Sequence, residues 1–129
     1  MIDRYVFRVW HKGKQHMYKN VAIGVGTNKI GYKMSGKRRY TWEEAENIVV
    51  NQCTGFKDSH DKNIFEGDIV RFGNNNSQIM SVHWQDYKYL FRKKLSSKSI
   101  DKFQHWKRFK SVEVIGNIFE NSELLNSHS

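Results

Sequence analysis

The sequence predicts a β-rich domain, built as a strongly bent sheet or small barrel with one or two short helices. Aromatic residues make up 14% of the 129 residues, and aromatic side chains suit half-buried pleated surfaces. Proline is absent, so glycine, asparagine and aspartate must set the turns. Within residues 53–72, two apolar runs flank a polar segment, and the second run opens with Gly67-Asp68. This pattern indicates two strands joined by a loop and a tight turn.

Alternation of side-chain type predicts the first strands. Residues 5–10 alternate in this way and are predicted as a strand. A polar turn follows, and then a short strand over residues 16–18. Residues 21–26 are apolar but interrupted by glycine, which indicates a bulge or close backbone packing.

A helical turn is predicted next. Thr41 and Glu44 have the spacing of a capping box, in which each residue's side chain bonds the other's amide. We therefore expect one turn of helix over residues 42–46. The β-branched residues that follow predict a strand over residues 48–54.

The second half of the chain contains further strand patterns. Strands are predicted over residues 64–72, 79–84, 87–91 and 112–119, and a short capped helical end over residues 121–125. The residues expected to face inward are apolar and mostly β-branched: Phe7, Val9, Ile48, Val50, Ile64, Ile69, Val82, Val114, Ile115 and Ile118.

Composition excludes several classes of protein. The chain has no uninterrupted run of about 18 apolar residues, so no membrane span is expected. The amino terminus lacks the apolar run of a signal peptide. The one cysteine, Cys53, cannot form an intrachain disulfide, which is typical of a cytosolic protein. The length predicts a single domain over residues 1–129.

Three segments in this order resemble one family. They are Phe7-Arg8-Val9-Trp10 with Met17-Tyr18, the central residues 52–70, and the closing residues 114–121. Together they resemble the YopX family of small phage- and prophage-encoded proteins. The resemblance covers nearly the whole chain.

That resemblance implies a mostly β fold with an SH3-like barrel part, a phage origin and action in the bacterial host cytoplasm. It implies no catalytic residue, binding residue or cofactor. The residues of its structural motif present in this chain are Thr54, Gly55, Asp58, Glu66, Gly67, Asp68, Gly116 and Asn117.

The positive charge is concentrated in one segment. The formal net charge of the chain is +9, and residues 88–110 hold nine basic residues and one acid, Asp101, which gives this segment +8. Rings are interleaved with these cations, and such a surface can stack bases or meet an acidic protein. The candidate binding residues are Lys88, Arg92, Lys93, Lys94, Lys98, Lys102, Trp106, Lys107, Arg108 and Lys110.

The same segment has an ordinary structural interpretation. Residues 99–110 also fit an amphipathic helix whose rings face the core and whose lysines face water. The sequence leaves both interpretations open. A smaller basic group, Lys33, Lys37, Arg38 and Arg39, lies near the turn at Gly36.

Catalytic patterns are weak. Asp58, Asp61, Glu66 and Asp68 are four carboxylates within eleven residues, but their order does not match a calcium loop, and turn-forming roles explain them. The six histidines form no metal-binding pair, and Cys53 lies in an apolar strand where cysteine acts as a small hydrophobe. We expect no metal and no cofactor.

The sequence therefore predicts a non-enzymatic phage accessory protein that binds a host or phage protein, with host takeover or counter-defence as the expected setting. The alternative is direct binding of nucleic acid by the basic aromatic segment 88–110. A small metal-dependent hydrolase using the carboxylates of residues 58–68 is a third hypothesis. Exposed sheet edges and the many aromatic residues also favour a homo-oligomer.

Overall fold

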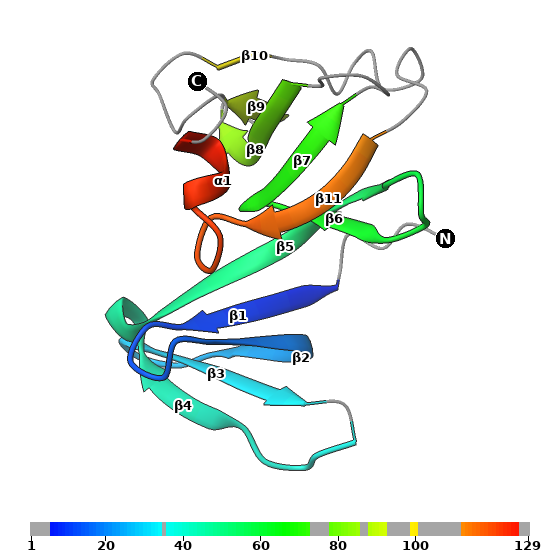
Figure 1. Ribbon diagram of the computed structural model, residues 1–129. Coiled ribbons are helices and arrows are strands. Elements are labelled where there is room, and N and C mark those ends of the chain that lie inside the picture. Colours follow the sequence, from blue (N-terminus) through cyan, green and yellow to red (C-terminus); the bar gives the residue numbers. More distant parts are fainter. Residues whose placement is uncertain are drawn as a thin grey trace. The chain divides into compact units, whose positions relative to one another are not determined.

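The structure of the protein is a computed structural model (Figure 1). It describes residues 6–34, 36–72, 78–85, 88–92, 99–100 and 112–126. The chain divides into two compact units, Met1–Cys53 (unit 1) and Thr54–Ser129 (unit 2). The division falls inside one strand, β5 (Ile48–Lys57), so each unit contains part of it. The expectation of a single domain stays a prediction.

Unit 1 is an antiparallel sheet with the strand order β4-β3-β2-β1-β5. Its other strands are β1 (Phe7–His11), β2 (His16–Val25), β3 (Lys29–Met34) and β4 (Thr41–Glu44). A single 3-10 turn, Ala45–Asn47, joins β4 to β5. A register shift at Phe7/Arg8 marks a bulge between β1 and β2.

One face of this sheet holds the core of unit 1. Val9, Val21, Tyr32 and Ile48 are buried there. Partly buried side chains pack against them: Phe7, Tyr18, Ile23, Ile30 and Val50. The alternation of side chains along each strand places these residues on a common face.

Unit 2 contains a second antiparallel sheet with the order β10-β9-β8-β7-β11. Its elements are β6 (Asn63–Phe65), β7 (Asp68–Phe72), β8 (Gln78–Gln85), β9 (Lys88–Arg92), β10 (Ser99–Ile100), β11 (Val112–Asn117) and the short helix α1 (Glu123–Asn126). Strand β6 pairs with β5.

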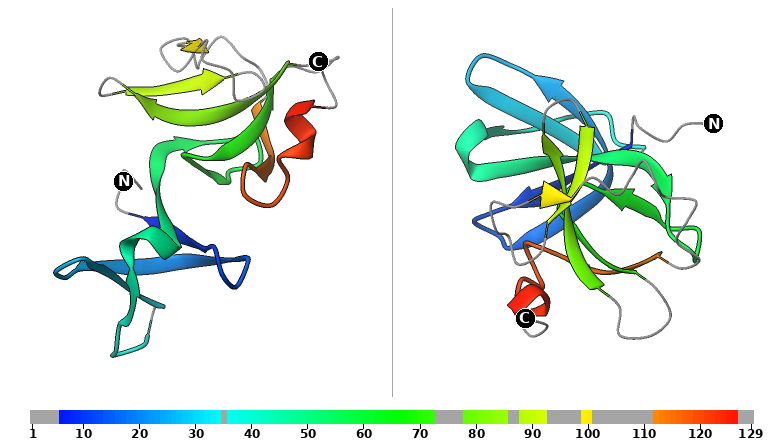
Figure 2. Two further views of the ribbon diagram at one scale, coloured as in Figure 1. Left: turned by 90° about the vertical axis from the view of Figure 1, so that its left-hand side faces the viewer. Right: turned by 90° about the horizontal axis from the view of Figure 1, so that it is seen from above.

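Two buried clusters stabilise unit 2. One contains Ile64, Val70, Met80, Val82 and Val112. The other joins Leu125 of α1 to Ile69 and Ile79, so α1 packs beside the five-stranded sheet (Figure 2). The residues that the sequence predicted to face inward are all buried in these clusters or packed against them.

The predicted class, a mainly β chain with little helix, is confirmed by the two antiparallel sheets. The SH3-like barrel stays a prediction. The predicted strand over residues 16–18 and residues 21–25 of the apolar run are parts of one ten-residue strand, β2, which ends before Gly26.

The predicted capping box is wrong. Residues 41–44 form strand β4, in which Thr41 pairs with Tyr32 and Trp42 pairs with Gly31. The local helix-start pattern is overridden because pairing with β3 satisfies the backbone and gives Trp42 a packing surface.

The predicted helix over residues 99–110 is wrong at its start, where Ser99 and Ile100 form β10 and pair with β9. Residues 101–110 lie outside the described part of the chain. The predicted helical end over residues 121–125 is confirmed as α1, although its helical residues are Glu123–Asn126.

Candidate functional site

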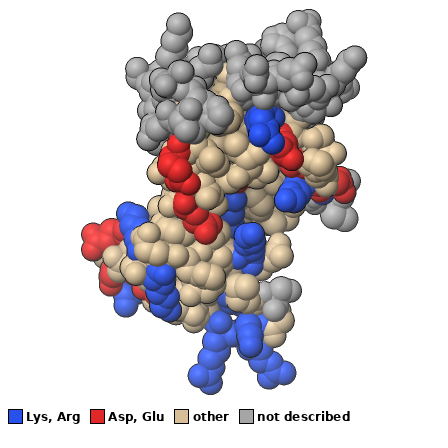
Figure 3. Space-filling view, in the orientation of Figure 1, with Lys and Arg blue, Asp and Glu red and all other residues tan. Residues whose placement is uncertain are grey.

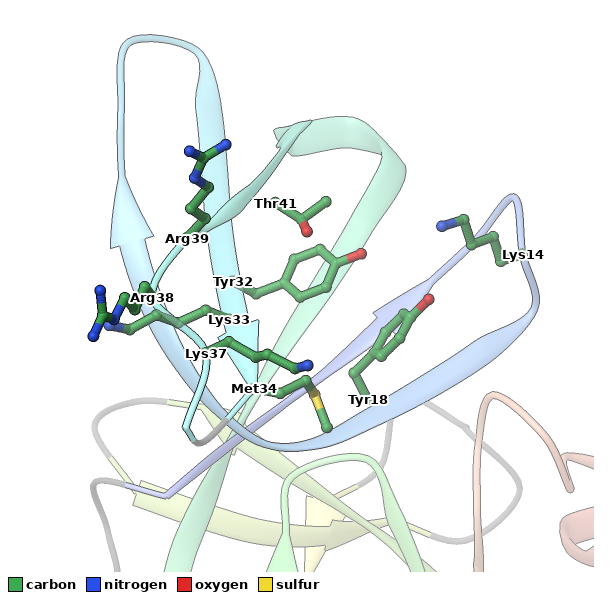
Figure 4. Close-up of a pocket in the computed structure, with 9 residues that line it drawn as sticks. All are labelled: Lys14, Tyr18, Tyr32, Lys33, Met34, Lys37, Arg38, Arg39 and Thr41. Atoms are coloured by element: carbon green, nitrogen blue, oxygen red, sulfur yellow. The ribbon is translucent and has the colours of Figure 1, made fainter.

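A pocket in unit 1 is the candidate site. Its cavity volume is about 460 Å³, and nine residues from the β1–β2 turn, β2, β3, the β3–β4 loop and β4 line it (Figure 4). They are Lys14, Tyr18, Tyr32, Lys33, Met34, Lys37, Arg38, Arg39 and Thr41.

The pocket is strongly cationic. Five of its nine lining residues are Lys or Arg, and none is Asp or Glu. None of the five forms an ion pair with any residue that the structure describes. Figure 3 shows Lys and Arg side chains gathered at the end of unit 1 that carries the β3–β4 loop. Because no acid of the described chain pairs with these cations, their positive charge attracts anions.

The cations do not all point the same way. In Figure 4 the ammonium groups of Lys14 and Lys37 point towards the tyrosines from different sides, whereas the guanidinium groups of Arg38 and Arg39 point away. Lys33 lies with its Nζ 5.0 Å from the centre of the Tyr40 ring. The two lysines that point inward are therefore the ones placed to contact a ligand inside the pocket.

Two tyrosines form the wall between these lysines. The ring centres of Tyr18 and Tyr32 are 5.1 Å apart, with the ring planes inclined at 35°. Tyr32 is only 4% exposed, and burial, together with the neighbouring Tyr18 and Glu43, raises the pKa of Tyr32 to about 12. Its hydroxyl therefore keeps its proton at neutral pH and can donate a hydrogen bond.

Local backbone contacts hold the two inward lysines in place. The amide of Lys14 donates to His11 Nδ1 at 3.0 Å, and the amide of Lys37 donates to the carbonyl of Met34 at 3.1 Å. Gly36 has a φ of +85°, a conformation that side-chain-bearing residues rarely adopt, and it turns the chain after β3. Both lysines are therefore held in turns, and neither lies in a strand.

The side chains that line this pocket are suited to binding a ligand. Its side chains offer ammonium, guanidinium and hydroxyl donors and the apolar surface of the two rings and Met34. A carboxylate or a phosphate is the kind of group that such donors recognise.

The binding residues predicted in segment 88–110 are not brought together by the described structure. Lys88 and Arg92 begin and end strand β9, and the positions of their side chains are not described. The others lie outside the described residues: Lys93, Lys94, Lys98, Lys102, Trp106, Lys107, Arg108 and Lys110. This site stays a prediction.

Asp58, a residue of the structural motif, is a backbone anchor in unit 2. Its Oδ1 accepts the amides of His60 and Lys62, both at 2.8 Å, and its Oδ2 accepts the amide of Val114 at 3.0 Å. Burial opposes ionisation of this carboxyl, but these three hydrogen bonds hold the pKa of Asp58 below its usual value. Asp58 thereby ties the β5–β6 loop to β11.

Thr54 and Asp68 also bond the backbone. The Thr54 hydroxyl donates to the carbonyl of Ile64 at 2.8 Å, and Asp68 Oδ2 accepts the amide of Phe65 at 2.8 Å. Gly55 and Gly67 have φ values of +88° and +87°. Glu66 lies in the turn between β6 and β7, beside Gly67.

Gly116 and Asn117 shape the end of β11. The register shifts between Val114 and Gly116, and a Cβ at Gly116 would lie 2.6 Å from Asn121 Oδ1. Asn117 Oδ1 accepts the amides of Phe119 and Glu120 at 3.0 and 2.9 Å. These contacts form the turn that leads into α1.

Among the described residues, no group of three or more His, Cys, Asp or Glu side chains is placed to hold a metal ion. The same part of the chain contains no helix long and apolar enough to cross a membrane.

The sequence indicated only part of the pocket. The basic group near Gly36 was visible in the sequence, and it supplies four of the five cations. Lys14, Tyr18 and Tyr32 were not identified as site residues, because strand pairing brings them to this group. The sequence feature that could have indicated these residues is the recurrence of tyrosine and lysine in β2 and β3.

Two solved structures share this fold. Protein EF1440 from Enterococcus faecalis is 22% identical, with a TM-score of 0.63, and the match covers 93% of this chain and 96% of that one. Protein yopX from Bacillus subtilis is 18% identical, with a TM-score of 0.63, and the match covers 94% and 98%. No curated protein matches the sequence. The family model for YopX protein matches residues 6–126. The resemblance seen in the sequence is thus confirmed, and this chain belongs to the YopX family.

Proposed function

We propose that this chain is a non-enzymatic phage accessory protein that binds an acidic region of a host or phage protein in the pocket of unit 1. The supporting observation is the set of five cations around that pocket, with no acid among the described residues that line it. Complementary charge speeds the encounter of two proteins and suppresses wrong partners. Action in the host cytoplasm, in takeover or counter-defence, is part of this proposal.

The pocket is large enough to receive a protein side chain. A cavity of about 460 Å³ accommodates one or two acidic side chains with their neighbouring backbone. Lys14 and Lys37 would pair with the carboxylate. Tyrosine and arginine at the pocket edge are residue types that often dominate the energy of protein interfaces.

The test is an affinity pull-down of the tagged protein from bacterial lysate, with and without nuclease, read by mass spectrometry. We expect to capture a partner protein that remains bound after nuclease treatment. The Lys14→Glu and Lys37→Glu variants should fail to capture this partner, and the Lys12→Glu variant should still capture it. Lys12 is the matched control because it is exposed in the same turn as Lys14 but does not line the pocket. A partner captured equally by all three variants would contradict the proposal.

The second candidate function is nucleic-acid binding by segment 88–110, which the +8 charge of this segment favours. Binding that depends on phosphate contacts weakens steeply with salt, because counterions are released. Replacing Lys93, Lys94, Lys107 and Arg108 with alanine should then flatten the salt dependence. An unchanged salt dependence would exclude this segment as the binding site.

A further inference from the structure

Trp42 lies flat against a strip of glycines in unit 1. A Cβ built on Gly31 would lie 2.9 Å from the Trp42 ring, and a Cβ on Gly26 or Gly24 would lie 3.2 or 3.3 Å from it. Real Cβ atoms do not approach other atoms as closely as 2.9 Å, so a side chain at Gly31 would displace the ring. The indole ring therefore packs on Gly24 of β2, on Gly26 just after β2, and on Gly31 of β3.

The outer face of this fixed ring is open. Trp42 is 46% exposed, although its inner face is covered by backbone. The Tyr40 ring lies beside it, with ring centres 5.6 Å apart and planes inclined at 43°. A rigid aromatic surface exposed to solvent loses little conformational entropy when a flat ligand stacks on it.

Lysines flank the ring on the same face of the sheet. Side chains alternate along a strand, so Lys29, Gly31 and Lys33 of β3 share one face, and Tyr32 of the pocket lies on the other. The two lysines lie four residues apart, which is about 13 Å along a strand. Lys29 is 3.9 Å from Glu44, but both side chains are half-exposed and such a pair is weak.

We infer that single-stranded nucleic acid binds this surface, with one base stacked on Trp42 and backbone phosphates beside Lys29 and Lys33. Exposed rings interleaved with cations recognise unpaired bases, whose flat faces are available, and their charged backbone. A duplex hides those faces in its own stack. This inference goes beyond the proposed function, because Trp42 and Lys29 do not line the pocket, although Lys33 does, and segment 88–110 is not required.

The test measures fluorescence anisotropy of a labelled oligothymidylate of about 12 nucleotides with the full chain at about 50 mM salt. Trp42→Ala is expected to weaken binding about tenfold or more, and Trp42→Phe by less, because a smaller ring remains. Gly31→Ala keeps the indole but displaces it, so it should weaken binding as well. A duplex of the same length should bind more weakly than the single strand.

Two variants serve as controls. Trp84 is 45% exposed, almost the same fraction as Trp42, and lies in β8 of unit 2, so Trp84→Ala should leave binding unchanged. Lys14→Glu, which should abolish partner capture in the proposed function, should also leave the oligonucleotide bound. Loss of one activity without the other separates failure of the proposed function from failure of this inference.

Several results would overturn the inference: no binding by the wild-type chain, an equal affinity for duplex, or equal losses in Trp42→Ala and Trp84→Ala. Circular dichroism and urea denaturation establish that each variant is folded. If Trp42→Ala fails to fold, the oligonucleotide affinities of the folded Trp42→Phe and Gly31→Ala variants test the inference instead. Wild-type affinity in both of these variants would also overturn the inference.

Discussion

His11 Nε2 lies 3.0 Å from Glu43 Oε2, although strands β2 and β3 separate β1 from β4 in the sheet order. The other ring nitrogen of His11, Nδ1, accepts the amide of Lys14 at 3.0 Å. Since Nδ1 accepts, the proton of the neutral ring is on Nε2, and His11 donates to the Glu43 carboxylate. One side chain therefore connects the edge strand of unit 1 to the turn that carries Lys14.

Replacing His11 with alanine should destabilise the protein by about 1–2 kcal/mol, because both hydrogen bonds are lost and the Glu43 carboxylate loses its partner. Urea denaturation at neutral pH measures this change. The matched control is Lys29→Ala, which breaks a pair between half-exposed side chains and should cost less than about 0.5 kcal/mol. Equal effects of the two variants would show that the His11 contact adds nothing to stability.

Asp58→Asn should destabilise the protein by about 2–3 kcal/mol at pH 7, because an amide nitrogen replaces one oxygen that accepts backbone N–H groups. The pKa of Asp58 is lowered from 3.8 in the folded state, so its contribution is present above that pH. It is lost as the pH falls through the lower folded-state pKa.

The difference in unfolding free energy between wild type and Asp58→Asn should therefore shrink in acid, as urea denaturation at pH 7 and at low pH would show. Asp61→Asn, at an exposed position of the same loop, is the control and should have little effect at either pH. A difference independent of pH would rule out the ionised carboxylate as its cause.

Tyr32 should ionise at a higher pH than an ordinary tyrosine does. Burial, Tyr18 and Glu43 raise its pKa from 10.0 to about 12, so the folded state holds this proton more tightly than the unfolded state. The stability this provides is complete below pH 10 and is lost as the pH rises towards 12. The phenolate absorbance of wild type minus that of Tyr32→Phe isolates this group.

We expect this difference to titrate near the raised pKa of Tyr32, and to shift towards the ordinary pKa of 10.0 in a Tyr18→Phe background, where one cause is removed. A difference that titrates at the ordinary pKa in the wild-type background would refute the assignment.

Gly116→Ala should destabilise unit 2 by about 1–3 kcal/mol, because the new Cβ would lie 2.6 Å from Asn121 Oδ1. That oxygen accepts the amide of Asn117 at 3.2 Å, so the clash also disturbs the turn into α1. A double-mutant cycle with Asn121→Gly tests the cause. Removing the Asn121 side chain should make the alanine less costly, and additive effects would show that the clash is not responsible.

The sequence predicted strands best where alternation and turn residues agreed. The run over residues 79–84 corresponds to β8, and the run over residues 64–72 corresponds to β6 and β7, which the turn at Gly67 separates. Strands β7 and β8 bury aliphatic side chains on both faces, with Ile69 and Ile79 in one cluster and Val70 and Met80 in the other. The prediction failed at Thr41, where a local capping pattern competed with pairing to β3. The seat that Gly31 offers to Trp42 is a contact between strands, and no local pattern encodes it.

Only the positive charge of the site could be predicted from the sequence. Lys37 and its basic neighbours are adjacent in the sequence, so their charge could be seen. The position of Tyr18 beside Tyr32 depends on the pairing of β2 with β1, whose register shifts at Phe7/Arg8, and on the pairing of β2 with β3. Register is set by the hydrophobic pattern of the paired strands and by turn geometry, so no single stretch of residues reveals it.

The buried thiol of Cys53 offers a chemical measure of how often the protein opens. Cys53 is the one cysteine of the chain, has no exposed surface, and is the last residue of unit 1, within strand β5. A thiol reagent can reach it only when that strand separates from its neighbours, so the labelling rate reports local opening. Each variant above can thus be compared for opening at the same atom, without attaching a probe in advance.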